Sequence, residues 1–170
     1  TFVLFMGAGY IIGGIRSALV VGSFILFIAM TEWWDRALIT MYMATFGVIV
    51  SGILGITIGT LSAQAKTSSR ITIGVCDTLQ TFPSFVYLIP VIMLFGVTDT
   101  SVLIAVVVYA TIPATRYTIE GLRSVPTALH DAGSMCGVTR LQRWLKIELP
   151  LAFPHMMLGI NQTVVFALFM

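Results

Sequence analysis

The sequence predicts an all-α fold, a polytopic transmembrane helix bundle. Of its 170 residues, 58% are hydrophobic and only 9% are charged, whereas soluble domains average about 25% charged residues. A soluble domain of this size has too much surface for its volume to hide so many apolar side chains, so lipid is the solvent that suits them. The chain stops at Met170 inside an apolar run, and we expect a fragment that lacks its C-terminal span or spans.

Apolar windows mark the expected spans. A helix needs about 20 apolar residues to cross a bilayer, and the candidate windows are residues 2–15, 17–30, 37–63, 73–97, 101–117 and 154–170. The sequence Gly13-Gly14-Ile15-Arg16 lies between the first two windows. One helix through both windows would place Arg16 in mid-membrane at a cost of several kcal/mol, so two separate helices are expected. We therefore expect a tight turn there, one membrane domain over residues 1–170, and a polar loop over residues 119–149.

The basic residues predict the orientation. When the windows alternate in direction, eight of the nine Lys and Arg residues fall on one side of the membrane and only Arg36 falls on the other. Cytoplasmic loops carry the excess of Lys and Arg, so the loop with Lys66 and Arg70 and the loop 119–149 are predicted to be cytoplasmic. Membrane lipid is the expected surrounding of the spans.

Small residues mark one face of the window 37–63. Gly55-Ile-Thr-Ile-Gly59 is a small-xxx-small motif, which lets helices approach closely. Packing within the chain is the expected use of this face, and a contact with a second copy is the alternative.

The window 73–97 contains prolines and polar side chains that a simple span would not need. Pro83 and Pro90 each remove a backbone donor, and carbonyl groups freed at membrane depth must face protein or a wet cavity. This pattern favours a discontinuous helix that lines a translocation pathway, and a kinked helix with polar residues near the interface is the alternative. The pathway candidates are Asp77, Gln80, Thr81, Phe82, Pro83, Ser84 and Tyr87, together with Asn161 and Gln162 of the last window, which could instead hydrogen-bond between helices.

The loop 119–149 reads as two helices joined by a turn. The first is expected over Thr127–Met135 with Gly137 as its stop. The second begins at Thr139, where Thr139 and Gln142 form a capping box, and ends before Pro150. A hairpin on the lipid surface, a docking element for a cytoplasmic partner and a DNA-binding motif are possible. The tether to the membrane and the lack of a concentrated basic face disfavour DNA.

A resemblance narrows these choices. Asp131-Ala132-Gly133, Gly137 and Ile147-Glu148-Leu149-Pro150 resemble the EAA loop of ABC importer permeases, E-A-A-x-x-x-G-x(9)-I-x-L-P. The spacing matches at every fixed position, while Asp131 replaces Glu and Gly133 replaces the second Ala. Residues 77–96 and Gly159-Ile-Asn-Gln-Thr163 resemble the glycine betaine/proline betaine, or quaternary amine, branch of these permeases. The resemblance covers residues 37–170.

The resemblance implies a type I ABC importer permease in the inner (plasma) membrane of a prokaryote. Such a chain pairs with a second permease copy, binds one cytoplasmic ATPase subunit and receives substrate from an extracytoplasmic binding protein. The chain would be no enzyme, would carry no cofactor or metal and would bind no nucleic acid, since the partner ATPase binds ATP and Mg. In keeping with this, the sequence has no GxxxxGK[ST] pattern. The residues expected to couple to the ATPase are Asp131, Ala132, Gly133, Gly137, Ile147, Leu149 and Pro150.

The expected substrate is a small osmolyte such as glycine betaine, proline betaine or choline. A permease of the same class for another amino acid or a sulfonate, and a non-transport membrane scaffold or channel, are the alternatives. His130 neighbours the coupling motif and is expected to be a solvated loop side chain, with contact to the partner as the alternative.

Overall fold

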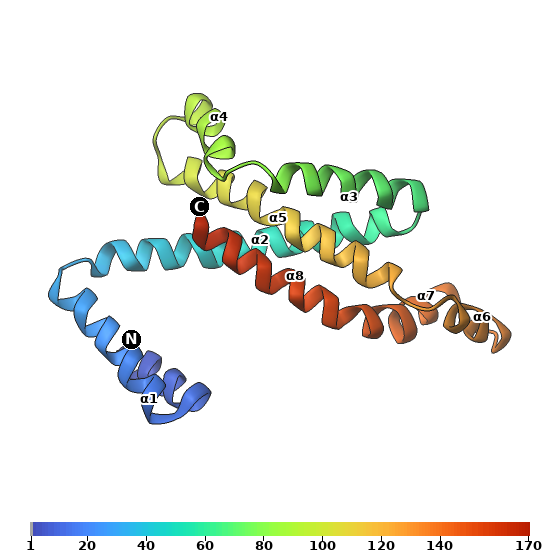
Figure 1. The fold of residues 1–170 in the computed structure, drawn as a ribbon, viewed down its shortest axis with the longest axis horizontal. Coiled ribbons are helices and arrows are strands. Elements are labelled where there is room, and N and C mark those ends of the chain that lie inside the picture. The colour runs from blue at the N-terminus through green and yellow to red at the C-terminus, as the bar shows by residue number, and fades with distance from the viewer. Residues whose placement is uncertain (1) are drawn as a thin grey trace. The chain divides into compact units, whose positions relative to one another are not determined.

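A computed structural model describes residues 2–170, with the side chains of residues 5–7 and 9–170. The regular structure of this part is helical (Figure 1), and its elements in chain order are α1 (Phe2–Met30), α2 (Trp34–Ala63), α3 (Lys66–Gln80), α4 (Phe85–Phe95), α5 (Asp99–Arg123), α6 (Thr127–Met135), α7 (Arg140–Arg143), the π-helical turn η1 (Trp144–Glu148) and α8 (Leu149–Phe169). Four described helical stretches are long and apolar enough to cross a membrane, and a bent pair raises the number to five. The predicted all-α membrane fold class is confirmed.

The described chain divides into two compact units, residues Thr1–Met43 and Ala44–Met170. The first unit holds α1, whose backbone leaves the helical region at Gly13 (φ −143°) and Gly14 (φ 70°). The positive φ at Gly14 is one that residues with a Cβ adopt at a cost. The two arms of α1 fold back on one another, since a Cβ at Gly9 would lie 3.2 Å from Val21 Cγ2. The turn therefore lies where the glycines predict it.

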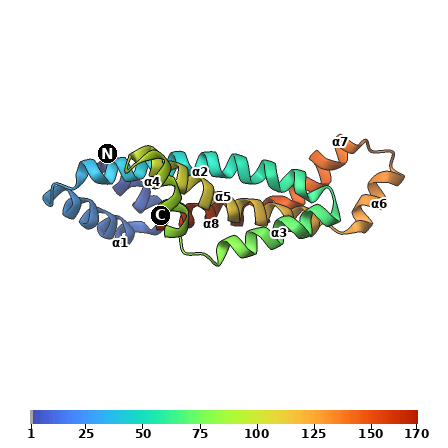
Figure 2. The ribbon, with the colours of Figure 1, turned by 90° about the horizontal axis from the view of Figure 1, so that it is seen from above.

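The second unit is built around α5, which packs along α8 and contacts α3 and α4 (Figures 1 and 2). The C-terminal half of α2 also packs on α5. A Cβ at Gly55 would lie 2.9 Å from the Thr115 amide nitrogen, and a Cβ at Gly59 would lie 2.9 Å from the Thr115 carbonyl oxygen. The small-xxx-small face is thus used for packing within the chain, as expected.

The predicted break in the window 73–97 is present. α3 and α4 are bent by 87° across residues 81–84, and Pro83 lies in this break. Carbonyl groups at the end of α3 find partners there, because the Tyr87 hydroxyl donates to the Leu79 carbonyl oxygen at 2.5 Å. Pro90 does not interrupt the chain in the same way. It stays inside α4, where its missing N–H removes one hydrogen bond without ending the helix.

The loop 119–149 follows the expected plan up to Thr139 and then departs from it. α6 has the predicted bounds, Thr127–Met135. The second helix does not stop before Pro150, so this expectation is wrong: α7 continues through η1 into α8, and Arg140–Phe169 is one membrane-length stretch. Pro150 directly follows the π-helical turn, in which the Leu149 N–H donates to the Trp144 carbonyl oxygen five residues back, and its missing N–H does not end the helix.

Candidate functional site

Residues 127–148, here named the polar hairpin, begin with a helix that has a well-defined end. At Gly137 the backbone has φ 69°, the left-handed conformation that glycine adopts at little cost. The Val138 N–H donates to the Gly133 carbonyl oxygen and the Gly137 N–H donates to the Ser134 carbonyl oxygen, both at 3.1 Å. This pair of bonds is a Schellman motif, which satisfies carbonyl groups that the helix end would leave free.

The second arm of the polar hairpin starts with the predicted capping box. The Gln142 N–H donates to Thr139 Oγ1 at 3.3 Å, and the Thr139 N–H donates to Gln142 Oε1 at 3.0 Å. Two backbone donors of the new helix are thereby satisfied. The turn between α6 and α7 is therefore fixed on both sides by hydrogen bonds that involve its own backbone.

The two arms pack through Gly133, which is buried. A Cβ at this position would lie 3.1 Å from Ile147 Cδ1, so Gly133 allows α6 to approach η1 closely. Glycine lowers helix propensity by about 1 kcal/mol relative to alanine, so Gly133 weakens α6 when this helix is considered by itself. The structure gives the residue a role in joining the arms.

The predicted coupling residues separate into two groups. Asp131, Ala132 and Gly137 are exposed, and Met135 beside them on α6 is 89% exposed. The remaining residues either pack between the arms or lie where η1 passes into α8: Gly133, Ile147, Leu149 and Pro150. An outer face of α6 is therefore available to another molecule, while the rest of the motif holds that face in place.

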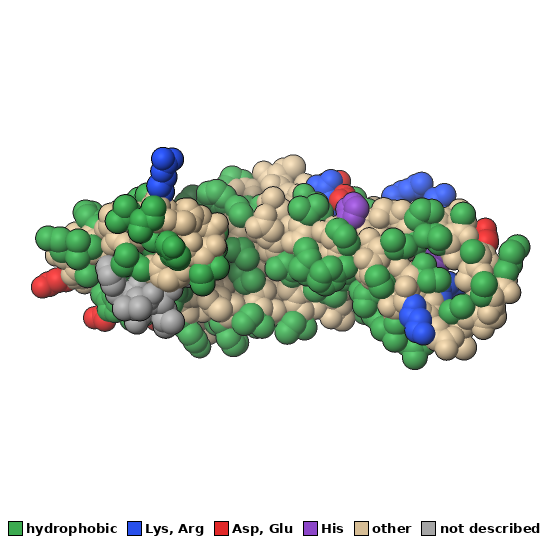
Figure 3. Space-filling view, turned by 90° about the horizontal axis from the view of Figure 1, so that it is seen from below, with side chains coloured by type: hydrophobic (Ala, Val, Ile, Leu, Met, Phe, Trp, Pro, Cys, Tyr) green, Lys and Arg blue, Asp and Glu red, His purple; other side chains and the backbone are tan. Residues whose placement is uncertain are grey.

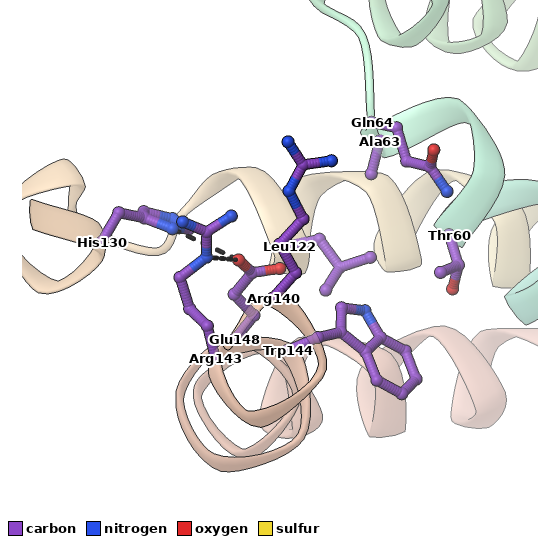
Figure 4. Close-up of a pocket in the computed structure, with 9 residues that line it drawn as sticks. All are labelled: Thr60, Ala63, Gln64, Leu122, His130, Arg140, Arg143, Trp144 and Glu148. Carbon is purple, nitrogen blue, oxygen red and sulfur yellow. Dashed lines mark hydrogen bonds and ion pairs between the residues drawn. The ribbon is translucent and has the colours of Figure 1, made fainter. Parts of the chain in front are cut away.

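Glu148 joins the two arms of the polar hairpin through the His130 side chain. His130 Nδ1 on α6 and Arg143 Nε each lie 3.2 Å from Glu148 Oε1 (Figure 4). His130, expected as a solvated loop side chain, is thus an ion-pair or hydrogen-bond partner of Glu148. The sequence carries no signal for the Arg143 contact. In an α-helix residues five apart point about 140° away from one another, and only the π-helical turn brings them to the same side.

Asp77 and Gln80, two of the predicted pathway residues, meet at Arg116 of α5. The Arg116 Nη1 atom lies 3.1 Å from Asp77 Oδ1 and 3.3 Å from Gln80 Oε1, while Arg116 Nε lies 3.0 Å from Glu120 Oε1. These contacts tie the last turn of α3 to α5 directly before the break. The spacing of Arg116 and Glu120, four residues apart on a helix, is a signal in the sequence, but the contact with α3 is not.

The other pathway candidates do not form one cluster. The Thr81 hydroxyl donates to the Thr78 carbonyl oxygen at 2.7 Å, Phe82 and Pro83 are exposed and Ser84 is half-buried. The Tyr87 ring lies 5.2 Å from that of Tyr109, which stacks on Phe166 of α8. Asn161 is exposed and Gln162 half-buried on α8, and within the described residues no hydrogen bond joins either to residues 77–87.

Figure 3 shows one face of the molecule, with its side chains coloured by type. Hydrophobic side chains cover much of the face, and several Lys and Arg side chains gather at the end that carries the polar hairpin. Within the described residues, no group of three or more His, Cys, Asp or Glu side chains could hold a metal ion.

Comparison with known proteins identifies the family. Residues 51–169 match the family described as "Binding-protein-dependent transport system inner membrane component". The chain is 75% identical over its whole length to the trimethylamine N-oxide transport system permease protein TmoV of Pelagibacter ubique, of which it covers 24%. It is 45% identical over 99% of its length to TmoV of Ruegeria pomeroyi, of which it covers 26%. Over 85% of its length it is 37% identical to the glycine betaine transport system permease protein OpuAB of Bacillus subtilis, of which it covers 51%.

These matches bear on the predictions directly. The chain spans about a quarter of the length of the two trimethylamine N-oxide relatives. The predicted permease family, its relation to the quaternary amine branch and the inner-membrane location are confirmed. The chain therefore belongs to the family of binding-protein-dependent transport system inner membrane components.

Proposed function

We propose that this chain is part of the permease of an ATP-driven importer for trimethylamine N-oxide or a closely related methylated amine, and that the polar hairpin docks the ATPase. The observation that carries the docking role is the exposed face of α6, formed by Asp131, Ala132 and Met135. This face sits on a short helix that is closed by Gly137 and held against η1 by Gly133 and Glu148.

The connection from α6 to the membrane helices supports a mechanical role. η1 passes without a break into α8, and α8 packs along α5. A push on α6 is therefore carried to α8 and α5 together, because rigid elements and packed cores shift as bodies rather than deform continuously. In this proposal the ATPase binds ATP and Mg, a second permease copy completes the pathway, and an extracytoplasmic binding protein delivers the substrate.

The break between α3 and α4 is the proposed wall of the pathway. Three polar residues lie at the end of α3 directly before the bend: Asp77, Gln80 and Thr81. A discontinuous helix next to polar side chains is the arrangement that transporters use at substrate sites. Arg116 would hold the inner end of this wall against α5.

The choice of substrate rests on the relatives. The two trimethylamine N-oxide permeases are 75% and 45% identical to this chain, against 37% for the glycine betaine permease of Bacillus subtilis. Trimethylamine N-oxide and glycine betaine share a trimethylated nitrogen with a formal positive charge, and they differ in the anionic group. We therefore place trimethylamine N-oxide ahead of glycine betaine, proline betaine and choline.

Docking is tested by reversing the charge on the exposed face. In the full-length protein, Asp131→Lys should weaken co-purification of the ATPase at least tenfold, because it places a cation where an anion faces the partner. Asp99→Lys is the control, since Asp99 is exposed at the opposite end of α5. If Asp131→Lys retains both the ATPase and uptake at the level of the control, the docking role is wrong.

Substrate choice is tested separately by competition. Cells that express the full-length protein with its partner subunits should accumulate labelled trimethylamine N-oxide, and excess unlabelled trimethylamine N-oxide should block uptake more strongly than equal glycine betaine. Stronger competition by glycine betaine would contradict the proposed substrate but not the proposed importer function. Absence of uptake together with absence of ATPase binding would overturn the importer itself.

A further inference from the structure

A cavity of about 660 Å³ opens between the polar hairpin and the ends of two membrane-length helices, all within residues 44–170 (Figure 4). The end of α2 contributes Gln64 and its neighbours, the end of α5 contributes Leu122, and the hairpin contributes the rest. The lining residues are Thr60, Ala63, Gln64, Leu122, His130, Arg140, Arg143, Trp144 and Glu148. The coupling role does not use this space.

The cavity carries a cation that the protein does not neutralise. Its lining contains two arginines and one carboxylate, and the carboxylate of Glu148 is already engaged by Arg143 and His130. Within the described residues the Arg140 guanidinium makes no hydrogen bond or ion pair. Figure 4 shows its guanidinium standing away from the two contacts of Glu148. The free guanidinium is suited to an anion, and its planar set of donors matches phosphate oxygens.

The rest of the lining combines polar and apolar groups. The Gln64 amide, the Thr60 hydroxyl and the Trp144 indole N–H can donate hydrogen bonds, whereas Leu122, Ala63 and the Trp144 ring form apolar wall. Tryptophan is enriched where a membrane meets water, and α2 ends at Ala63, directly beside Gln64. The cavity thus lies at the end of membrane-length helices and offers both a phosphate contact and an apolar surface.

We propose that this cavity binds the phosphate of an anionic phospholipid such as phosphatidylglycerol. Arg140 contacts the phosphate, Gln64 and Trp144 donate to the headgroup, and Leu122 meets the start of an acyl chain. A soluble phosphate would leave the apolar wall unused, and basic pockets at the cytoplasmic ends of membrane helices are suited to anionic headgroups. The proposal rests on the cytoplasmic placement of the hairpin in the proposed function. A bound lipid would link the end of α2 to the hairpin.

The test counts bound lipid on the full-length protein, purified through a tag on the permease after co-expression with its ATPase. Native mass spectrometry at increasing phosphatidylglycerol should show a tightly held molecule that phosphatidylcholine does not replace. Arg140→Gln should weaken this binding about tenfold, the effect of losing one charge-assisted contact, and Arg140→Lys should weaken it less. Lys146→Gln is the matched control, because Lys146 is exposed on the same hairpin and does not line the cavity.

Three outcomes would overturn the proposal. Equal phosphatidylglycerol binding by the wild type and Arg140→Gln would show that Arg140 holds no lipid. An equal loss in Arg140→Gln and Lys146→Gln would indicate general attraction to the hairpin instead of a site. Displacement of the lipid by millimolar inorganic phosphate would assign the cavity to a soluble anion. Because lipid is counted without ATP or transport, an Arg140-dependent lipid on a permease that fails to bind the ATPase would overturn the proposed function alone.

Discussion

Gly55 and Gly74 are both helical glycines, but a methyl group would meet very different surroundings at the two positions. At Gly55, on α2, an added Cβ would lie 2.9 Å from the Thr115 amide nitrogen and 3.0 Å from the Thr111 carbonyl oxygen. These are backbone atoms of α5, so they cannot move without moving the helix. At Gly74, on α3, nothing lies within 4 Å of an added Cβ. Comparing Gly55→Ala with Gly74→Ala therefore measures the effect of the close packing between α2 and α5.

The expected magnitude follows from subtracting one variant from the other. Both Gly→Ala changes gain the same helix propensity, about 1 kcal/mol, which cancels in the comparison. Overpacking at Gly55 costs about 1–3 kcal/mol. The free energy of unfolding of the Gly55→Ala protein should therefore be about 1–3 kcal/mol below that of the Gly74→Ala protein, and its Tm should be lower.

The assay is thermal unfolding of the full-length protein in the same detergent, followed by circular dichroism. Gly74→Ala should melt at or above the wild-type temperature, and Gly59→Ala should fall with Gly55→Ala because its Cβ would lie 2.9 Å from the Thr115 carbonyl oxygen. Equal melting temperatures for Gly55→Ala and Gly74→Ala would refute the close approach. The small-xxx-small face would then serve some other contact, such as one with a second copy.

Two further predictions concern the turn at Gly137 in the polar hairpin and the contact of Arg116 with the end of α3. Gly137→Ala should destabilise α6 by about 1–2 kcal/mol, because the backbone at this position has a positive φ, and Gly137→Asn should destabilise it by less. Faster amide exchange at Val138 should report the destabilisation. Equal exchange in the wild type and both variants would contradict the left-handed turn. Arg116→Gln should lower the Tm more than the double change Arg116→Gln/Asp77→Asn, because removing one partner leaves the other charge unpaired. A double variant less stable than the single one would argue against the pair.

Local signals explain what the sequence predicts well. The bounds of α6, the turn at Gly137 and the capping box of Thr139 depend on hydrogen bonds between residues a few positions apart. The break at Gly13 and Gly14 and the break at Pro83 are also local, since they follow from backbone freedom and from a missing donor. Such features are readable without knowledge of the neighbouring helices.

Tertiary contacts explain what the sequence cannot predict. Gly133 lowers the helix propensity of α6, and only its packing against Ile147 explains why a small residue suits this position. Pro150 reads as a helix stop, although η1 carries the chain past it into α8. Arg143 and Glu148 are placed together only by the π-helical turn. In each case the decisive partner is supplied by packing or by an irregular turn, and neither leaves a periodic pattern in the sequence.

The bend between α3 and α4 and the π-helical turn η1 share one feature: a side-chain contact joins each of them to a neighbouring helix. At the bend between α3 and α4, helical hydrogen bonding is interrupted, and Arg116 ties the adjoining turn of α3 to α5. At η1 the hydrogen-bond spacing changes, and Glu148 ties that turn to α6. An irregular turn alone would absorb a displacement, because its hydrogen bonds are poorer than those of an α-helix. In the proposed docking role, the contact between His130 and Glu148 would pass a displacement of α6 to α8, which packs along α5, the helix that also contacts α3 and α4.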